Sequence, residues 1–431
     1  MAKRNKYIFF LLSAFLLLLI PLQHFMKAAP IVSYTAIFTS ASVLYLAAAV
    51  FIFKSEISHK QILIIALAAF LIKLSFVASP VTGSDDIYRY MWDGKIQSNG
   101  INPYLYAPDD SRLAPYHSDL LPKALNFKEM KTIYFPLSQW LFYTGYKLGG
   151  ESVWGYKLLL LIFELLTIWS IILLLKKTDT DLKYSLLYIL APLPFFEFAI
   201  DAHLDGFGLP LLLFSIYFFI DKKYLFSAFF LGLSLSIKPV GLLLAPVYLL
   251  SQKTNTERMK FIFTAAVSFF IQFVFYISNT NPFESFFIFT KNWFFNGFVF
   301  NLLNSVVHNN QTSRLICAAF LILSLLPVYF SKKEFTDKIY FSVLLLMIFS
   351  PVVHPWYIAW VLILVPLSKK WSGIYFTAMA SLTAFTVLNY QLYGIWKDYW
   401  IVLFIEYLPT LILLIYELKG AGFNFKPFRN N

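Results

Sequence analysis

The residues best suited to chemistry lie in a polar segment, Pro80 to Lys131, that interrupts an otherwise apolar chain. The segment opens with Ser84-Asp85-Asp86-Ile87-Tyr88-Arg89-Tyr90-Met91-Trp92-Asp93-Gly94 and continues to Ile101-Asn102-Pro103-Tyr104. A carboxylate can take a proton, and a cation beside it can hold an anion. The run contains three carboxylates, an arginine and three aromatic residues at a membrane edge. Packing of the helix does not require such a concentration of charged groups, so the composition predicts a functional site.

The run predicts a short helix. Ser84 or Asp85 can cap its start, Asn99-Gly100 can end it, and carboxylates in the first turn suit the positive end of the helix dipole. We expect Asp85 to meet Arg89 four residues on. The i, i+3, i+4, i+7 spacing then defines one helix face, which carries Asp86, Arg89, Tyr90 and Asp93.

Two interpretations of this face are open. In the first, it offers a carboxylate base, a cation beside it and an aromatic wall for a sugar ring. In the second, it belongs to a capped interfacial helix whose aromatic residues form a belt at the bilayer surface. The second interpretation does not explain why three carboxylates share the motif, so we favour the first.

Three further polar clusters interrupt apolar stretches. In Asp201-Ala202-His203-Leu204-Asp205-Gly206, a histidine between two acids suits a metal ion, a phosphate or a helix cap, and the metal has the weakest support. Lys238-Pro239 places a cation at a helix break, where it either meets a phosphate or extends to the surface. His354-Pro355-Trp356-Tyr357 either lines a site or is a turn with an interfacial aromatic residue.

The composition predicts an all-α membrane protein, a polytopic transmembrane helical bundle. The 431 residues are 59% hydrophobic and only 13% charged, and apolar stretches of roughly twenty residues recur along the chain. We expect one domain over 1–431 with about 13 to 14 spans, and a loop of short interfacial helices over 80–150. The expected spans are 7–26, 31–53, 61–79, 152–175, 184–200, 206–220, 224–239, 240–251, 259–278, 314–331, 338–353, 355–368, 371–390 and 399–418.

The net charge of +12 follows from where the basic residues lie. Counted from the basic start of the chain, clusters such as Lys176-Lys177, Lys222-Lys223 and Lys369-Lys370 fall on one side, together with both termini. The positive-inside rule makes that side cytoplasmic. The charge therefore gives no reason to expect nucleic acid, and the polar clusters are expected on the outer face.

Residues typical of metal and nucleotide sites are scarce. The chain has one cysteine, Cys317, and six histidines without ligand spacing. It has no Gly-rich phosphate loop, nucleotide-binding unit or nucleophile elbow. We expect no cofactor, a divalent metal being allowed but not supported, and an activated substrate drawn from the membrane itself.

The motifs resemble those of the integral-membrane glycosyltransferases of the GT-C superfamily, most closely the bacterial mannosyltransferases that use polyprenyl-phosphomannose. The resemblance covers residues 60–370 and is carried mainly by the run from Asp85 to Gly94 and by Gly100-Ile101-Asn102-Pro103-Tyr104 with Tyr106-Ala107-Pro108. Phe135-Pro136-Leu137 resembles a Pro-Pro-Leu of the family and departs from it at the first position.

The resemblance implies inverting transfer of mannose or another hexose from a polyprenyl phosphate to a lipid or glycan acceptor, outside the bacterial cytoplasmic membrane. Its register points to Asp86 as the general base, with Asp85 as the rival. The candidate cations for the leaving phosphate are Arg89, Lys238 and His354. The other residues expected to contact substrates are Tyr90, Asp93, Asn102, Tyr104, His203, Asp205 and Tyr357.

Two other functions are weighed against this one. A flippase or transporter of lipid-linked sugars should carry charges along the bundle interior at mid-depth, whereas only Lys73, Glu164 and Glu406 lie well inside the expected spans. A polysaccharide polymerase or ligase would join longer lipid-linked chains. The residues do not identify the sugar, the acceptor or the linkage.

Overall fold

The computed structural model describes residues 30–277 and 280–420. In this part of the chain helices make up the regular structure, and the only β-type pairing is a pair of isolated bridges from Phe295 and Asn296 to Val352. The expected all-α fold is confirmed. The first expected span, 7–26, lies outside the described residues.

The described chain divides into two compact units. The first contains residues 30–76, 168–197 and 294–420, and the second contains residues 77–167 and 198–293. Two helices, α7 (Trp154–Lys177) and η3 (Phe195–Ile200), pass from one unit into the other. The single domain expected over 1–431 stays a prediction.

The first unit is a set of packed apolar helices. Within it, α20 packs on α3 and α22, and α16 packs on α17. Glu406 is buried there and accepts a hydrogen bond from the Asn296 side chain at 2.7 Å. Apart from the parts of α7 and η3 that it shares with the second unit, its helices are α3 (Pro30–Lys54), α4 (His59–Ser75), η2 (Leu182–Ser185), α8 (Leu186–Ile189), α9 (Pro192–Pro194), α15 (Phe298–Val307), α16 (Asn310–Phe330), α17 (Phe335–Phe349), α18 (Pro355–Leu362), α19 (Val365–Ser368), α20 (Trp371–Met379), η6 (Ala380–Thr383), α21 (Ala384–Tyr393) and α22 (Trp400–Leu418).

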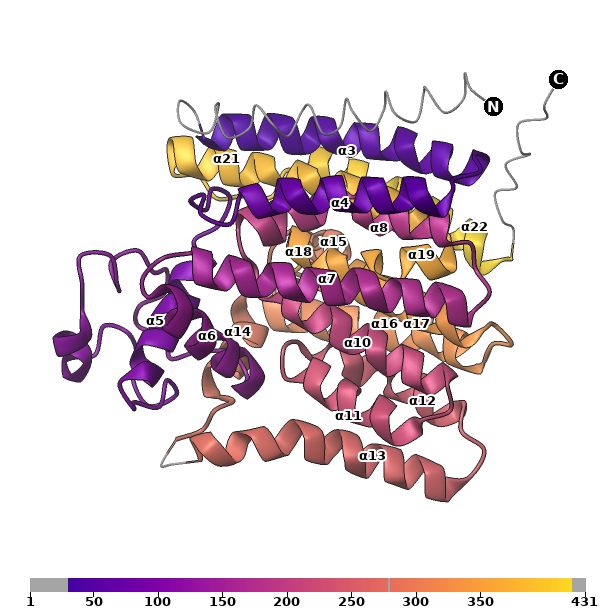
Figure 1. Ribbon diagram of the computed structural model, residues 1–431. Coiled ribbons are helices and arrows are strands. Elements are labelled where there is room, and N and C mark those ends of the chain that lie inside the picture. Colours follow the sequence, from indigo (N-terminus) through magenta and orange to yellow (C-terminus); the bar gives the residue numbers. More distant parts are fainter. Residues whose placement is uncertain (1–29, 278–279, 421–431) are drawn as a thin grey trace. The chain divides into compact units, whose positions relative to one another are not determined.

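The second unit combines short polar-loop helices with apolar ones. Figure 1 shows α10, α11 and α13 as successive neighbours, and α5 beside α6. Its helices are α5 (Asp86–Ser98), η1 (Ser111–Tyr116), α6 (Pro136–Gly149), α10 (Asp205–Ile220), α11 (Tyr224–Leu235), η4 (Pro239–Leu244), α12 (Ala245–Leu250), α13 (Asn255–Phe270), η5 (Ile271–Tyr276) and α14 (Glu284–Asn292).

Six described helices are long and apolar enough to cross a membrane, or up to seven when one pair bent by 51° counts as a span. This count is lower than expected because several apolar runs are broken. Proline lacks an amide donor and restricts the residue before it, and Pro239 accordingly separates α11 from η4, as predicted from Lys238-Pro239. The six are Pro30–Lys54, Trp154–Lys177, Asn255–Tyr276, Asn310–Phe330, Trp371–Tyr393 and Trp400–Leu418.

The helix predicted in the polar segment is α5, and it begins and ends where the sequence places it. Asp85 precedes it and Asn99 follows it. The α5–α6 contact is close because Gly94 has no side chain, and a Cβ there would clash with the backbone carbonyl of Phe142. Tyr90 stacks on the Phe142 ring with 4.5 Å between centroids. The two helices therefore form a rigid support for the residues at the start of α5.

Candidate active site

At the N-terminus of α5, two neighbouring carboxylates contact different partners. The Asp85 carboxylate accepts a hydrogen bond from the Asn126 side-chain amide at 2.5 Å. The Asp86 carboxylate lies 3.6 Å from Nδ1 of His203, and 37% of its side chain is exposed. The N-cap residue is Asp85, one of the two expected, but its side chain makes no cap hydrogen bond, and the Ser84 hydroxyl accepts from the Asp86 amide at 3.3 Å. Asp86 is thus the carboxylate that both meets the second polar cluster and reaches solvent.

The Asp85 carboxyl is harder to ionise than a carboxyl in water. Burial, and after it the negative charge of Asp86, raises the pKa of Asp85 from 3.8 to about 6. Because the folded-state pKa lies above the unfolded one, the ionised carboxylate costs stability. The contribution of the protonated form to stability is complete below pH 4 and is lost as the pH rises through 6.

We therefore expect Asp85→Asn to stabilise the protein at neutral pH. The amide keeps an acceptor for Asn126 but removes the buried charge, so the free energy of unfolding at pH 7.5 should rise by about 1–3 kcal/mol. The gain should vanish near pH 4. Denaturant unfolding of the purified protein in detergent measures both values. Asp119→Asn, at a fully exposed residue of the same loop, is the control, and a pH-independent gain would contradict the assignment.

The second polar cluster is the turn from Asp201 to Asp205. One Asp201 oxygen accepts the backbone amides of Thr82 and Gly83, each at 2.8 Å. Ala202 has a φ of +61°, a left-handed conformation that costs free energy in a residue with a Cβ and recurs at functional sites. The strained turn places Asp201 on the segment that leads into α5, and His203 on Asp86.

Asp205 and Lys238 complete this cluster. The ammonium of Lys238 donates to the Asp205 carboxylate at 2.6 Å, and their side chains are 18% and 1% exposed. Lys238 lies within electrostatic range of Asp86 as well. A carboxylate, an imidazole and a cation from three separate parts of the sequence therefore belong to one cluster.

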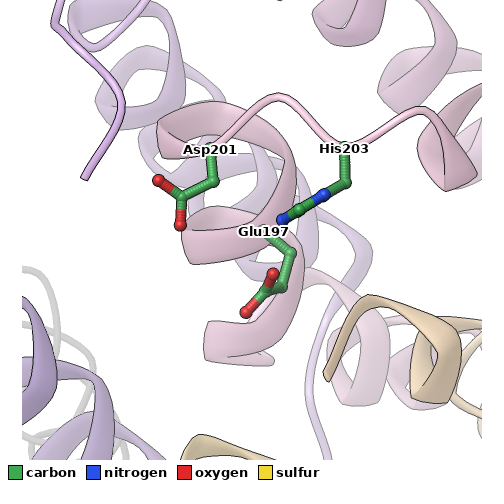
Figure 2. Close-up of side chains that lie close together, drawn as sticks. All are labelled: Glu197, Asp201 and His203. Atoms are coloured by element: carbon green, nitrogen blue, oxygen red, sulfur yellow. The ribbon is translucent and has the colours of Figure 1, made fainter. Parts of the chain in front are cut away.

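A possible metal-ligand set overlaps this turn. Ligand atoms of Glu197, Asp201 and His203 lie within 4.8 Å of one another, and all three residues are buried. Figure 2 shows Glu197 and Asp201 projecting from one helix end and His203 from the chain that follows it. One Asp201 oxygen already accepts two amides, and His203 faces Asp86. The residue types fit a divalent ion, and two of the three residues also have these contacts within the protein.

Arg89 does not meet Asp85, and this expectation from the helical spacing is wrong. Its guanidinium donates instead to Asp93 at 2.9 Å and to the Met130 carbonyl at 2.9 Å. Asp85 lies before the helix with non-helical backbone angles, and its side chain is held by Asn126. Arg89 is thereby occupied in holding the loop to α5, which removes support for it as a phosphate ligand.

The remaining residues of the predicted helix face serve packing. Tyr90 is 1% exposed and enclosed by Phe142 and Tyr134, so its ring is no open wall for a sugar. Asp93 is buried and accepts from Arg89 and from the Gln139 amide, which also donates to Thr132. This network ties α5 to α6.

The loop after α5 is held by its own polar residues. The Asn102 amide donates to the Tyr276 carbonyl at 3.0 Å, and the Tyr104 hydroxyl donates to the Tyr134 carbonyl at 2.6 Å. Tyr104 is buried. We therefore assign both residues, predicted to contact substrate, to the positioning of the loop.

His354 and Tyr357 belong to the first compact unit, not to the unit that holds the other candidates. His354 precedes α18 and stacks on Trp356 with 4.3 Å between ring centroids, while Tyr357 meets the His354 ring edge-on. These contacts agree with the second interpretation of this motif given above, a turn with an interfacial aromatic residue. A role of either residue toward substrate stays a prediction.

Sequence reasoning missed residues that shape the site. Asn126 carries no motif around it, and its contact with Asp85 spans 41 positions of the chain. Gln139 lies in a stretch whose sequence predicts either an interfacial helix or a simple helix start, and neither assigns it a role. For Asp201, the close spacing to His203 and Asp205 is the sequence feature that indicates a role in the site. Contacts that are distant in sequence have no local pattern.

The fold and the site define a helical membrane protein with an aspartate, a histidine and a lysine–aspartate pair gathered beside the N-terminus of a loop helix. A comparison of the sequence with models of protein families identifies the family of this protein. The model of the MptA_B family, described as alpha-(1->6)-mannopyranosyltransferase, N-terminal domain, matches residues 13–252. This match covers more than half of the chain, and the chain belongs to that family. A search among curated proteins found no match.

Membership confirms the resemblance seen in the motifs. The chain is a membrane glycosyltransferase of a mannosyltransferase family, and its apolar helices agree with an integral membrane protein. The matched region includes all of α5, the turn from Asp201 to Asp205, and Lys238. It ends before His354 and Tyr357.

Proposed function

We propose that this protein transfers a mannosyl group from a polyprenyl-phosphate donor to a hydroxyl of a saccharide or lipid-linked saccharide, with Asp86 as the general base. The observation that carries the proposal is the placement of Asp86 beside His203, two residues from Asp205, which holds Lys238 in an ion pair. Family membership supports the sugar. The lack of any nucleotide-binding motif in the sequence supports a lipid-borne donor.

In the proposed reaction, the acceptor oxygen attacks the anomeric carbon and the bond from that carbon to the phosphate oxygen breaks. The electron pair leaves with the polyprenyl phosphate, and the Asp86 carboxylate takes the acceptor proton. One displacement inverts the anomeric centre. A general base of this kind contributes roughly 10²–10⁴-fold to the rate.

Lys238 is the cation best placed to stabilise the leaving phosphate. It is held by Asp205 at 2.6 Å, so its position is set before substrate binds. A cation fixed in a water-poor site stabilises developing charge without having to reorganise. Arg89 is less suited, because its guanidinium already binds Asp93 and the Met130 carbonyl.

His203 and Asp201 act as positioning residues in this proposal. The imidazole of His203 is fully buried and lies against the Asp86 carboxylate, which limits the orientations of that group. Asp201 holds the backbone of Thr82 and Gly83, which directly precede Ser84 at the start of the segment that leads into α5. The base is thus fixed both from its own helix and from the turn.

The acceptor group follows from the linkage in the family description. An α-(1→6) bond forms when the oxygen on C6 of a hexose is the nucleophile, so we propose a primary hydroxyl of a mannose-type saccharide as acceptor. The positive-inside rule predicts that the basic loops and both termini are cytoplasmic. The site would then work on the outer side of the bacterial cytoplasmic membrane.

Donor specificity tests the proposal directly. Purified protein in detergent should transfer radiolabelled mannose from a polyprenyl phosphate to a mannose-containing acceptor. It should transfer none from a soluble nucleotide sugar when no lipid carrier is present. Transfer from the nucleotide sugar alone would overturn the assignment of the donor.

A further inference from the structure

The loop beside the N-terminus of α5 carries an exposed phenylalanine that packs on a partly buried tryptophan. Phe127 is 50% exposed and meets Trp293 edge-on, with 4.7 Å between ring centroids. Trp293 in turn lies 5.4 Å from the ring of Phe289 in α14. We propose that Phe127 and Trp293, the acceptor platform, bind a sugar ring of the acceptor, an inference that rests on the proposed glycosyl transfer.

The backbone at Phe127 is strained. Its φ is +52°, a conformation that is uncommon outside glycine and an outlier for a bulky residue. Strain of this type persists where the surroundings over-determine it, and it clusters at ligand-binding positions. Burial does not explain the strain here, because half of the side chain remains exposed.

Three contacts hold this segment in place. The Asn126 amide donates to Asp85 at 2.5 Å, the Met130 carbonyl accepts from Arg89 at 2.9 Å, and Lys131 binds Glu284 at 3.0 Å. Asp85 and Arg89 lie at the start of α5, and Glu284 is the first residue of α14. The loop is therefore fixed on both sides while the Phe127 ring is directed outward.

The chemistry of the platform suits a saccharide. The face of an aromatic ring carries partial negative charge, so it attracts the C–H groups on the apolar face of a pyranose. The same segment carries groups that can hydrogen-bond to hydroxyls, namely the Asn126 amide, which precedes Phe127, and Lys131, which binds Glu284. Because Asn126 contacts Asp85, the residue next to Asp86, a sugar bound here lies in the neighbourhood of the proposed base.

A bilayer anchor is the other use of exposed aromatic residues at a membrane surface. It requires apolar bulk, whereas sugar stacking requires a flat ring. Phe127→Leu separates the two, because leucine keeps the apolar volume and loses the ring. Phe127→Tyr keeps the ring and should behave as wild type in both cases.

A matched pair elsewhere in the same unit supplies the control. Phe275 is 70% exposed and meets Trp140 edge-on with 5.1 Å between centroids. It lies on the candidate membrane span Asn255–Tyr276, and its ring partner Trp140 belongs to α6 rather than to the loop around Phe127. Phe275→Leu therefore repeats the same chemical change in the same kind of ring pair.

The experiment measures transfer to a synthetic α-(1→6)-linked mannose disaccharide over a range of concentrations. Phe127→Leu should raise KM for the disaccharide roughly tenfold, with KM for the donor and the slow hydrolysis of the donor by water unchanged. Phe275→Leu should leave all of these values at wild-type level. An unchanged disaccharide KM in Phe127→Leu would overturn the platform.

The two levels of the proposal fail in different ways. If the wild-type protein transfers mannose from a polyprenyl phosphate but Phe127→Leu is indistinguishable from it, the platform alone is wrong. If the wild-type protein uses no polyprenyl-phosphate sugar, the proposed function is wrong and the platform falls with it. Equal losses in Phe127→Leu and Phe275→Leu would also reject the platform, since a common loss reports a general effect on the membrane protein.

Discussion

Asp86→Asn is expected to lower mannosyl transfer by roughly 10²–10⁴-fold, the usual contribution of a general base. Asparagine keeps the size of the side chain and an acceptor oxygen, but it cannot take the acceptor proton. Because 37% of the Asp86 side chain is exposed, the free energy of unfolding should change by no more than about 1 kcal/mol. The rate is measured with purified protein at saturating donor and acceptor.

Asp85→Asn is the matched control for this variant, since it makes the same change one residue earlier. Its carboxylate contacts Asn126 rather than His203, so we expect transfer close to wild type. Donor binding should persist in both variants. Normal transfer by Asp86→Asn with loss in Asp85→Asn would exchange the two roles. Normal transfer by both would show that the N-terminus of α5 is not the catalytic centre.

The second large effect is expected from neutralising the ion pair of Lys238 and Asp205. Lysine alone cannot be removed cleanly, because the buried Asp205 carboxylate would lose its partner, at a cost of about 3–5 kcal/mol in stability. The double variant Lys238→Gln/Asp205→Asn replaces the charges with two amides that can still hydrogen-bond. The fold should survive, and transfer should fall by roughly 10²–10³-fold, as for the loss of one preorganised stabilising group.

The control for the double variant is a second ion pair of the same unit. Lys223 binds Asp221 at 2.9 Å, and Lys223→Gln/Asp221→Asn should leave transfer unchanged. Thermal unfolding in detergent confirms that both double variants are folded. If Lys238→Gln/Asp205→Asn were folded and fully active, Lys238 would not be the cation for the leaving phosphate.

Local features of the sequence were sufficient for the elements of the site. Ser84-Asp85 and Asn99-Gly100 predicted the bounds of α5, because helix ends depend on a few adjacent residues. Pro239 determined the break beside Lys238 for the same reason. The apolar composition determined the helical membrane fold, since a bilayer leaves a segment few other ways to satisfy its backbone.

Only the tertiary structure decided which polar groups meet. Both Asp85 and Asp93 lie four residues from Arg89, and the spacing alone could not choose between them. Asn126 draws Asp85 away, and the Met130 carbonyl fixes Arg89 toward Asp93. In the same way, the left-handed backbone of Ala202 directs the His203 side chain toward Asp86, which lies more than a hundred positions earlier in the sequence. Partners so distant along the chain are brought together by packing, which leaves no periodic signal in the sequence.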